Sequence, residues 1–240
     1  MHYPIYHRIK IFIKKERKTH MSNKIKSILV YKNETASFDI DAQRTFTPLC
    51  PNELPVPDGD KIADELNKNA TFASLRIASR DAHPANALWI ASEAHPCLSP
   101  IQGQPDMDVY WTKHAIVGTD GFSFIPGLDP EAYDFQVYKG VEPDKHPYGA
   151  CYHNLKDTLS TGVIEYLKAN HIHTVICGGL ATDYCVLNTV RQLNNAGFHV
   201  ILNKAACRGI APDTTDAAVN EMETMKNVIV VEDSSQIKAI

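Results

Sequence analysis

Short β-type runs alternate with amphipathic helical runs along this chain, and this order restricts its fold more than any other feature. Strands are predicted over residues 36–40, 75–79, 135–138, 174–178, 198–202 and 228–231, and helices over 60–70, 158–170, 183–195 and 213–225. Such alternation is typical of βαβ units, in which helices cover both faces of a parallel sheet. The sequence therefore predicts an α/β fold with three layers, α/β/α, around a mostly parallel, doubly wound sheet of roughly six strands.

The first twenty residues differ from the rest of the chain in charge. They contain six lysines and arginines against one glutamate, a net charge of +5. Since the whole chain has a net charge of −4, residues 21–240 have a net charge of −9. Their apolar residues are too few for the hydrophobic region of a secretory signal, and no small-residue cleavage site follows. We therefore interpret residues 1–20 as a basic extension outside the fold and residues 21–240 as a single domain. A targeting address is the alternative for the extension.

Composition excludes several classes of function. Hydrophobic residues make up 44% of the 240 residues and charged residues 22%, as in globular proteins. The body of the chain has no basic face for nucleic acid, and its apolar runs are far shorter than the roughly 20 residues that span a bilayer. Six cysteines without a C-x-x-C pair predict reduced thiols and a cytoplasmic location.

Residues just after the predicted strands are the first candidates for function, because ligands of such sheets bind at the carboxyl ends of the strands. Asp41 follows the first strand and Lys139 the third. Taken alone, each has an ordinary structural interpretation, a turn residue for the aspartate and a solvated strand end for the lysine. The segment 81–135, rich in Pro, Gly and His, is long enough to indicate a functional loop.

Cys185 is the strongest candidate nucleophile. It stands in the string GGLATDYCV, in the first turn of the helix predicted over 183–195, where Thr182 or Asp183 can act as N-cap. The positive end of a helix dipole favours a thiolate, and free N–H groups there can bind an oxyanion. A dinucleotide-binding turn would need G-x-G-x-x-G, which is absent. With Asp41 as base and Lys139 as cation, Cys185 is suited to covalent catalysis; a buried structural cysteine is the alternative.

A metal site is indicated by the strings RDAHP and WTKH. Asp81 and His83 lie two apart on extended chain, so their side chains point the same way, and His114 follows thirty-one positions later. One carboxylate and two imidazoles leave coordination positions open, which suits a working Zn²⁺, Fe²⁺ or Mn²⁺. Chance is the alternative, because the chain has eleven histidines.

Five strings, taken in order, resemble those of the isochorismatase-like cysteine hydrolases over about residues 36–232: DAQRTF, RDAHP, WTKH, YKG and GGLATDYCV. The metal-type strings resemble those of the nicotinamidases within that family. The resemblance implies a catalytic triad of Asp41, Lys139 and Cys185. It also implies a cis peptide between Leu180 and Ala181, which would turn the N–H groups of Ala181 and Cys185 towards an oxyanion.

The same resemblance assigns residues to the substrate and the metal. It implies that the substrate ring is flanked by Phe46, Trp111 and Tyr184. It implies that the metal is held by Asp81, His83 and His114. Many relatives carry a further histidine four positions after the D-x-H histidine, and here that position is Ala87. We therefore expect one metal ligand fewer than in those relatives.

The activity implied is hydrolysis of nicotinamide, and also of pyrazinamide, to the acid and ammonia through a cysteine thioester, in NAD salvage. The implied cofactor is one divalent ion, Zn²⁺ first, with Fe²⁺ or Mn²⁺ as alternatives, and the implied partner is the small-molecule substrate. Neither nucleic acid nor a membrane is expected, and a homo-oligomer stays open. Two other functions stay open: an amidase of the same family for a carbamoyl or ureido substrate, and a metal- or nucleotide-binding module without turnover.

Overall fold

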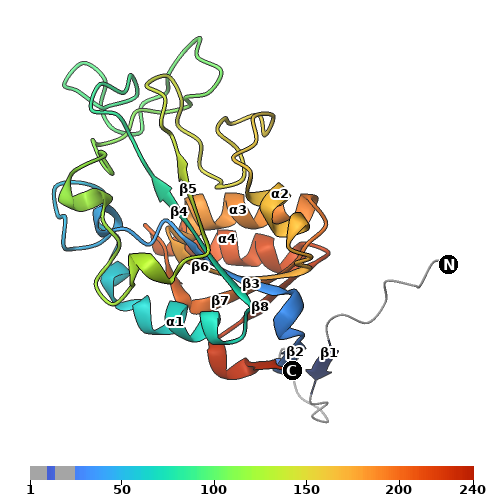
Figure 1. Ribbon diagram of the computed structural model, residues 1–240. Coiled ribbons are helices and arrows are strands. Elements are labelled where there is room, and N and C mark those ends of the chain that lie inside the picture. The colour runs from blue at the N-terminus through green and yellow to red at the C-terminus, as the bar shows by residue number, and fades with distance from the viewer. Residues whose placement is uncertain (1–9, 14–24) are drawn as a thin grey trace.

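The computed structural model describes residues 10–13 and 25–240, and its centre is a six-stranded sheet (Figure 1). The strand order is β5-β4-β3-β6-β7-β8, and every neighbouring pair is parallel. The strands are β3 (Thr35–Ile40), β4 (Leu75–Asp81), β5 (Phe135–Lys139), β6 (Thr174–Leu180), β7 (His199–Arg208) and β8 (Val228–Val231). The predicted α/β class and doubly wound sheet are confirmed.

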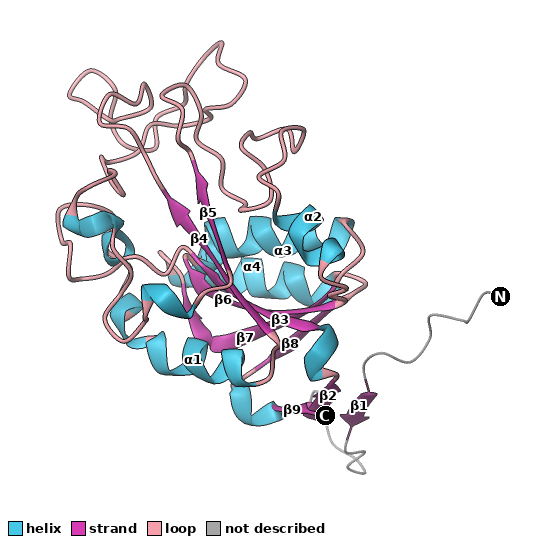
Figure 2. Ribbon diagram, viewed as in Figure 1, coloured by secondary structure: helices cyan, strands magenta, loops and turns pink. Residues whose placement is uncertain are grey.

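Helices cover both faces of this sheet (Figure 2). They are α1 (Ala63–Thr71), α2 (Val163–Ala169), α3 (Leu187–Asn195) and α4 (Pro212–Thr224). On β6, the side chains of Val175 and Cys177 join the core under α2, α3 and α4, whereas Ile176 points to the opposite face. Leu66 of α1 packs in a separate core on that opposite side. The three predicted layers are therefore present.

A second, three-stranded sheet was not predicted. It consists of β1 (Lys10–Ile13), β2 (Ile25–Val30) and β9 (Ile237–Ala239), with β2 parallel to β9 and antiparallel to β1. Ile28 and Ile237 pack against Ile201 of the main sheet. Strand β1 belongs to the basic extension and pairs with β2, and the division into an extension and a single domain stays a prediction. Residues 1–9 and 14–20 of the extension lie outside the described residues.

Two helices differ from their predicted bounds for local reasons. The side chain of Asn154 accepts hydrogen bonds from the N–H groups of Thr158 and Leu159, which holds the chain in a turn, and α2 begins only after Gly162 at φ 90°. The helix expected over 183–195 is a π-helical turn, Thr182–Val186, followed by α3. Neither predicted N-cap residue caps it.

Asp183 has a different function in the fold. Its carboxylate accepts hydrogen bonds from the N–H groups of Ile210 and Ala211, at 3.1 and 3.4 Å, and from the hydroxyl of Thr214. The turn that carries Cys185 is therefore tied to the start of α4. In the part of the chain that the structure describes, no helix is long and apolar enough to cross a membrane. The six cysteines are free, and only Cys97 is exposed.

Candidate active site

Three side chains from different strand ends meet at the carboxyl edge of the main sheet. Nζ of Lys139 lies 3.0 Å from Oδ2 of Asp41 and 3.7 Å from Sγ of Cys185. A carboxylate oxygen of Asp41 lies within 4.8 Å of that sulfur. All three residues are buried. The structure thus brings together the residues predicted to act as base, cation and nucleophile.

Lys139 is not a solvated strand end but a fully buried cation. Its ammonium contacts carboxylates of both Asp41 and Asp81 and donates to the carbonyl of Pro147 at 3.3 Å. Burial alone would lower the pKa of Lys139, but the two carboxylates outweigh it and hold this pKa well above its usual value. Lys139 therefore stays charged and occupies the centre of the acidic cluster.

Asp41 is held in one orientation by its neighbours. The Ser79 hydroxyl donates to Oδ1 of Asp41 at 2.7 Å, and the backbone at Asp41 is left-handed, with φ 45°. Burial raises the pKa of this carboxyl, and the nearby Lys139 only partly opposes the rise. A carboxylate with a raised pKa is a stronger base, so Asp41 is suited to accept a proton from a thiol.

The thiol of Cys185 is protonated at rest, contrary to the thiolate expected from a helix dipole. Burial raises the pKa of Cys185 well above its usual value, against the opposing charge of Lys139. Cys185 lies inside the π-helical turn that precedes α3. Attack by this sulfur therefore requires a base, and Asp41 is the nearest candidate.

The peptide between Leu180 and Ala181 is cis and directly precedes the turn that carries the cysteine. The carbonyl of Ala181 accepts hydrogen bonds from the N–H groups of Tyr184 and Val186, both at 3.1 Å. The turn is thus closed on the carbonyl side of Ala181. The N–H groups predicted for an oxyanion belong to Ala181 and Cys185, at the two ends of the same short segment.

A cluster of imidazoles lies beside this group. His83 follows β4, His114 lies in the long segment after it, and His146 follows β5. One ring nitrogen from each lies within 4.8 Å of the others, and all three residues are buried. Burial lowers the pKa of His114 to about 3 and that of His146 well below its usual range, so both rings are neutral. Neutral imidazoles are good metal ligands, and His146 was not among the predicted residues.

Backbone carbonyls orient two of these rings. Nδ1 of His83 lies 3.0 Å from the carbonyl of Gly140, and Nδ1 of His114 lies 2.7 Å from that of Thr112. Each Nδ1 can thus donate, which leaves Nε2 free to bind a metal. Asp81 lies between the two clusters, with Oδ2 3.6 Å from Nε2 of His83 and Oδ1 on Lys139. Neutral imidazoles and a carboxylate are donors that Zn²⁺, Fe²⁺ or Mn²⁺ accept, so these residues fit a divalent ion.

A small cavity of about 300 Å³, partly open to solvent, lies over both clusters and is walled by aromatic rings. The predicted wall residues Phe46, Trp111 and Tyr184 all line it. The rings of Trp111 and Tyr184 meet edge to face at 5.1 Å. Tyr148, which was not predicted, also lines the cavity; its hydroxyl accepts from Nε1 of Trp111 at 3.2 Å and donates to Asp108 at 2.8 Å.

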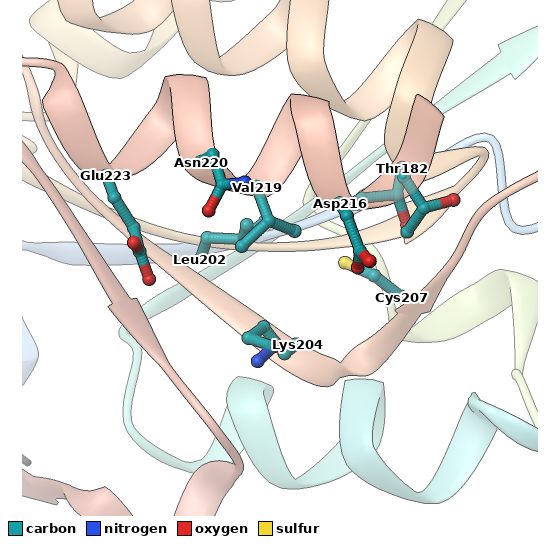
Figure 3. A pocket seen from close by; sticks show the side chains of 9 residues that line it. Thr182, Leu202, Lys204, Cys207, Asp216, Val219, Asn220 and Glu223 are labelled. Carbon is teal, nitrogen blue, oxygen red and sulfur yellow. The ribbon is translucent and has the colours of Figure 1, made fainter. Parts of the chain in front are cut away.

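A larger cavity of about 770 Å³, including the part open to solvent, lies between α4 and β7 (Figure 3). Its walls include Cys207, Asp216 and Lys204. Burial raises the pKa of Cys207 to about 12, so this thiol is inert. Both groups of three potential ligand atoms found among the described residues lie at the smaller cavity. Among the described residues, both clusters of potential ligands therefore lie at the carboxyl edge of the sheet.

The doubly wound parallel sheet with a buried Cys–Asp–Lys cluster is the arrangement expected of a hydrolase that uses a cysteine nucleophile. The family described as "Isochorismatase domain" matches residues 35–234, so the chain belongs to the isochorismatase family. Among its curated relatives, the nicotinamidase of Escherichia coli is 32% identical over 190 residues, which cover 77% of this chain and 87% of the relative. The family predicted from the five strings is confirmed.

Solved structures agree with this assignment. A structure described as an Acinetobacter baumannii nicotinamidase and pyrazinamidase superposes with a TM-score of 0.77 at 29% identity, covering 85% of this chain and 97% of that one. A Pyrococcus horikoshii pyrazinamidase in complex with zinc gives a TM-score of 0.65 at 30% identity, covering 82% and 98%. The shared fold therefore extends over nearly the whole of both neighbours.

Proposed function

We propose that this protein is a nicotinamidase, which hydrolyses nicotinamide, and also pyrazinamide, to the acid and ammonia. The observation that carries the proposal is the position of Cys185, which lines a small aromatic cavity and has its sulfur 3.7 Å from the Lys139 ammonium that pairs with Asp41. Aromatic walls suit a flat ring with a primary amide, with the amide towards the sulfur. The similarity to curated nicotinamidases supports the same substrate class.

Aromatic walls bind the ring of the substrate. Phe46 comes from a turn after β3, Trp111 from the long segment after β4, and Tyr184 from the turn before α3. Stacking or edge contacts with such walls contribute about 0.5–1.5 kcal/mol beyond the burial of apolar area. These contacts fix the plane of the ring, and the direction of the amide then depends on polar groups.

A divalent ion is the cofactor we propose, held by Asp81, His83 and His114. Zn²⁺ is the first choice, because the similar Pyrococcus pyrazinamidase is in complex with zinc, with Fe²⁺ and Mn²⁺ as alternatives. When bound, the ion supplies an open position that can accept the pyridine nitrogen and so orient the ring. His114, His146 and Cys185 all line the cavity, so the ring nitrogen and the amide of one substrate would face different groups.

The covalent step begins at Cys185. Asp41 accepts the thiol proton, and the sulfur attacks the amide carbon to form a C–S bond and an oxyanion. The N–H groups of Ala181 and Cys185 donate to that oxyanion, and Lys139 stabilises the negative charge nearby. Asp41 returns the proton to the leaving nitrogen, the C–N bond breaks, and ammonia departs.

Hydrolysis of the thioester uses the same residues in reverse order. Asp41 accepts a proton from water, whose oxygen attacks the thioester carbon. The C–S bond breaks, the sulfur regains a proton, and the acid leaves. One nicotinamide and one water thus give one nicotinate and one ammonia. Such a product would enter NAD salvage, and a cytoplasmic location is the expectation from the free cysteines.

An ammonia-release assay on a panel of amides tests the proposal. We expect turnover of nicotinamide and pyrazinamide and little turnover of carbamoyl or ureido compounds. Preference for a ureido compound would show that the protein is another amidase of this family and not a nicotinamidase. Tight binding of nicotinamide without ammonia release would point to a binding module instead. Size-exclusion chromatography of the same sample addresses the homo-oligomer.

A further inference from the structure

We propose that His146 is a metal ligand, which supplies from the segment after β5 the imidazole that position 87 lacks. The inference rests on the metal site proposed above and extends it. The expectation from the sequence was the opposite, that Ala87 leaves the site one ligand short. The structure offers a third imidazole from a different part of the chain.

The polar atoms of His146 are buried and have no partner. Its side chain belongs to a residue only 4% exposed, and among the described residues neither ring nitrogen makes a hydrogen bond. Nε2 of the fully buried His83 makes no hydrogen bond either, and its nearest carboxylate oxygen, Oδ2 of Asp81, lies 3.6 Å away. Buried polar atoms are nearly always satisfied, and those that are not indicate a missing ion or water. A cation between the two rings would satisfy both residues at once.

The spacing of the rings fits one ion. The ring of His146 lies 5.2 Å from that of His83 and 5.5 Å from that of His114, centroid to centroid. One nitrogen from each of the three lies within 4.8 Å of the others. Three nitrogens bound to one ion at about 2.1 Å lie about 3.4–3.6 Å from one another, so the rings would have to move closer together on binding.

Hydrogen bonds hold the segment of His146 against the place where the other histidine would stand. The N–H of Leu88 donates to the carbonyl of Pro143 at 2.8 Å, and Nε1 of Trp89 donates to the carbonyl of Lys145 at 3.2 Å. The N–H of His146 itself donates to the carbonyl of Asp106 at 2.8 Å. The residues that follow Ala87 therefore position the segment that carries His146.

Trp89 forms a common wall for the rings. It is fully buried, and its ring meets those of His83 and His146 edge to face, at 4.5 Å in both cases. Ala87 itself is buried in the apolar cluster that contains Trp89 and Trp111. The small residue at position 87 and the imidazole at position 146 thus both pack around Trp89. The negative charge for the ion comes from Asp81, beside His83.

A competing explanation assigns His146 to the substrate. Its ring is nearly parallel to that of Trp111, at 6.0 Å and 17°, and it lines the cavity. A ring that only contacts substrate would change the KM for nicotinamide and leave metal affinity unchanged. A ligand would change metal affinity even without any substrate. Metal binding by the resting protein therefore separates the two explanations.

The experiment measures Zn²⁺ content and affinity in the full-length protein. His146→Ala and His146→Gln are compared with wild type, with His83→Ala as the ligand control and His95→Ala as the control for an exposed histidine. Elemental analysis gives metal per chain, and competition with a chromogenic chelator gives the Kd for Zn²⁺. We expect both position-146 variants and His83→Ala to bind Zn²⁺ at least tenfold more weakly, and His95→Ala to match wild type. Equal Kd values for wild type, His146→Ala and His146→Gln would overturn the proposal.

A measurement on wild type alone tests the proposal even if the variants fail to fold. X-ray absorption of the zinc-loaded protein counts the imidazoles around the ion, and we expect three. Two imidazoles, or no Zn²⁺ bound at all, would contradict the proposal. Neither readout depends on turnover. If wild type releases no ammonia from nicotinamide but binds Zn²⁺ through His146, the proposed function fails and this inference stands. If wild type releases ammonia but binds Zn²⁺ without His146, the proposed function stands and this inference fails.

Discussion

The ammonium of Lys139 lies 3.7 Å from the sulfur of Cys185, and both side chains are buried. A buried ammonium is costly unless carboxylates compensate it, and here Asp41 and Asp81 do so. The same contact places a fixed positive charge beside a thiol that is neutral at rest. We expect this charge to stabilise the thiolate that forms when Asp41 removes the proton.

Replacement of Cys185 by alanine tests the covalent step. Cys185→Ala should lower turnover of nicotinamide by about a thousandfold or more, because the nucleophile is gone, while the protein stays folded. Cys207→Ala should keep most of the activity, because this buried thiol lies at the other cavity. Ammonia release and circular dichroism provide the measurements. Wild-type rates in Cys185→Ala would rule out the covalent mechanism.

Removal of the buried cation should cost both activity and stability. Lys139→Met leaves two buried carboxylates without their cation, which should destabilise the fold by about 3–5 kcal/mol. Adding Asp81→Asn removes one of those charges and should restore part of the stability but none of the activity. Urea unfolding and ammonia release distinguish the two effects. A single variant as stable as wild type would show that Lys139 is not needed to hold the carboxylates.

The metal is expected to orient the ring rather than to generate the attacking water. His83→Ala, or chelated enzyme, should raise the KM strongly for nicotinamide and much less for benzamide, which lacks the ring nitrogen. Steady-state kinetics on the two amides makes the comparison. Equal losses on both would favour a metal-activated hydroxide, and unchanged kinetics on both would remove the metal from the reaction.

Glu65 gives the fold a pH dependence that is independent of the site. Burial alone would raise the pKa of Glu65, but hydrogen bonds from Lys68, Asn203 and Ser234 outweigh it and lower this pKa to about 2. A pKa below the usual 4.5 means that the stabilisation is fully present above about pH 4.5 and is lost as the pH falls towards 2.

The variant Glu65→Gln tests this pH dependence of stability. Glu223→Gln, on the exposed side of α4, is the matched control. We expect Glu65→Gln to lower the free energy of unfolding by about 1 kcal/mol at pH 7, because the charge-assisted hydrogen bonds weaken. At pH 3 the difference from wild type should be smaller. Urea unfolding at both pH values measures it. A constant difference at the two pH values would contradict the assigned pKa.

Much of the fold could be predicted because its signals are local. The six main strands follow from short apolar runs, and β8 has the predicted bounds 228–231. Strands β2 and β9 were missed, since Ile28 and Ile237 acquire their meaning only by packing on Ile201, far away in the chain. The helix expected from residue 158 was too long, because the Asn154 side chain competes for backbone N–H groups in a way that periodicity does not reveal.

The sequence by itself determined the class of fold, the family and the candidate residues Asp41, Lys139 and Cys185. These could be predicted because each strand end and each motif is a local pattern of a few consecutive residues. Only the tertiary structure decided the protonation states of these residues and which side chains surround them. Burial, not helix position, sets the protonation of Cys185, and the two carboxylates around Lys139 come from different strands. His146 lies among His83 and His114 through contacts between distant segments. Desolvation and long-range proximity are properties of the folded chain, so no local pattern can express them.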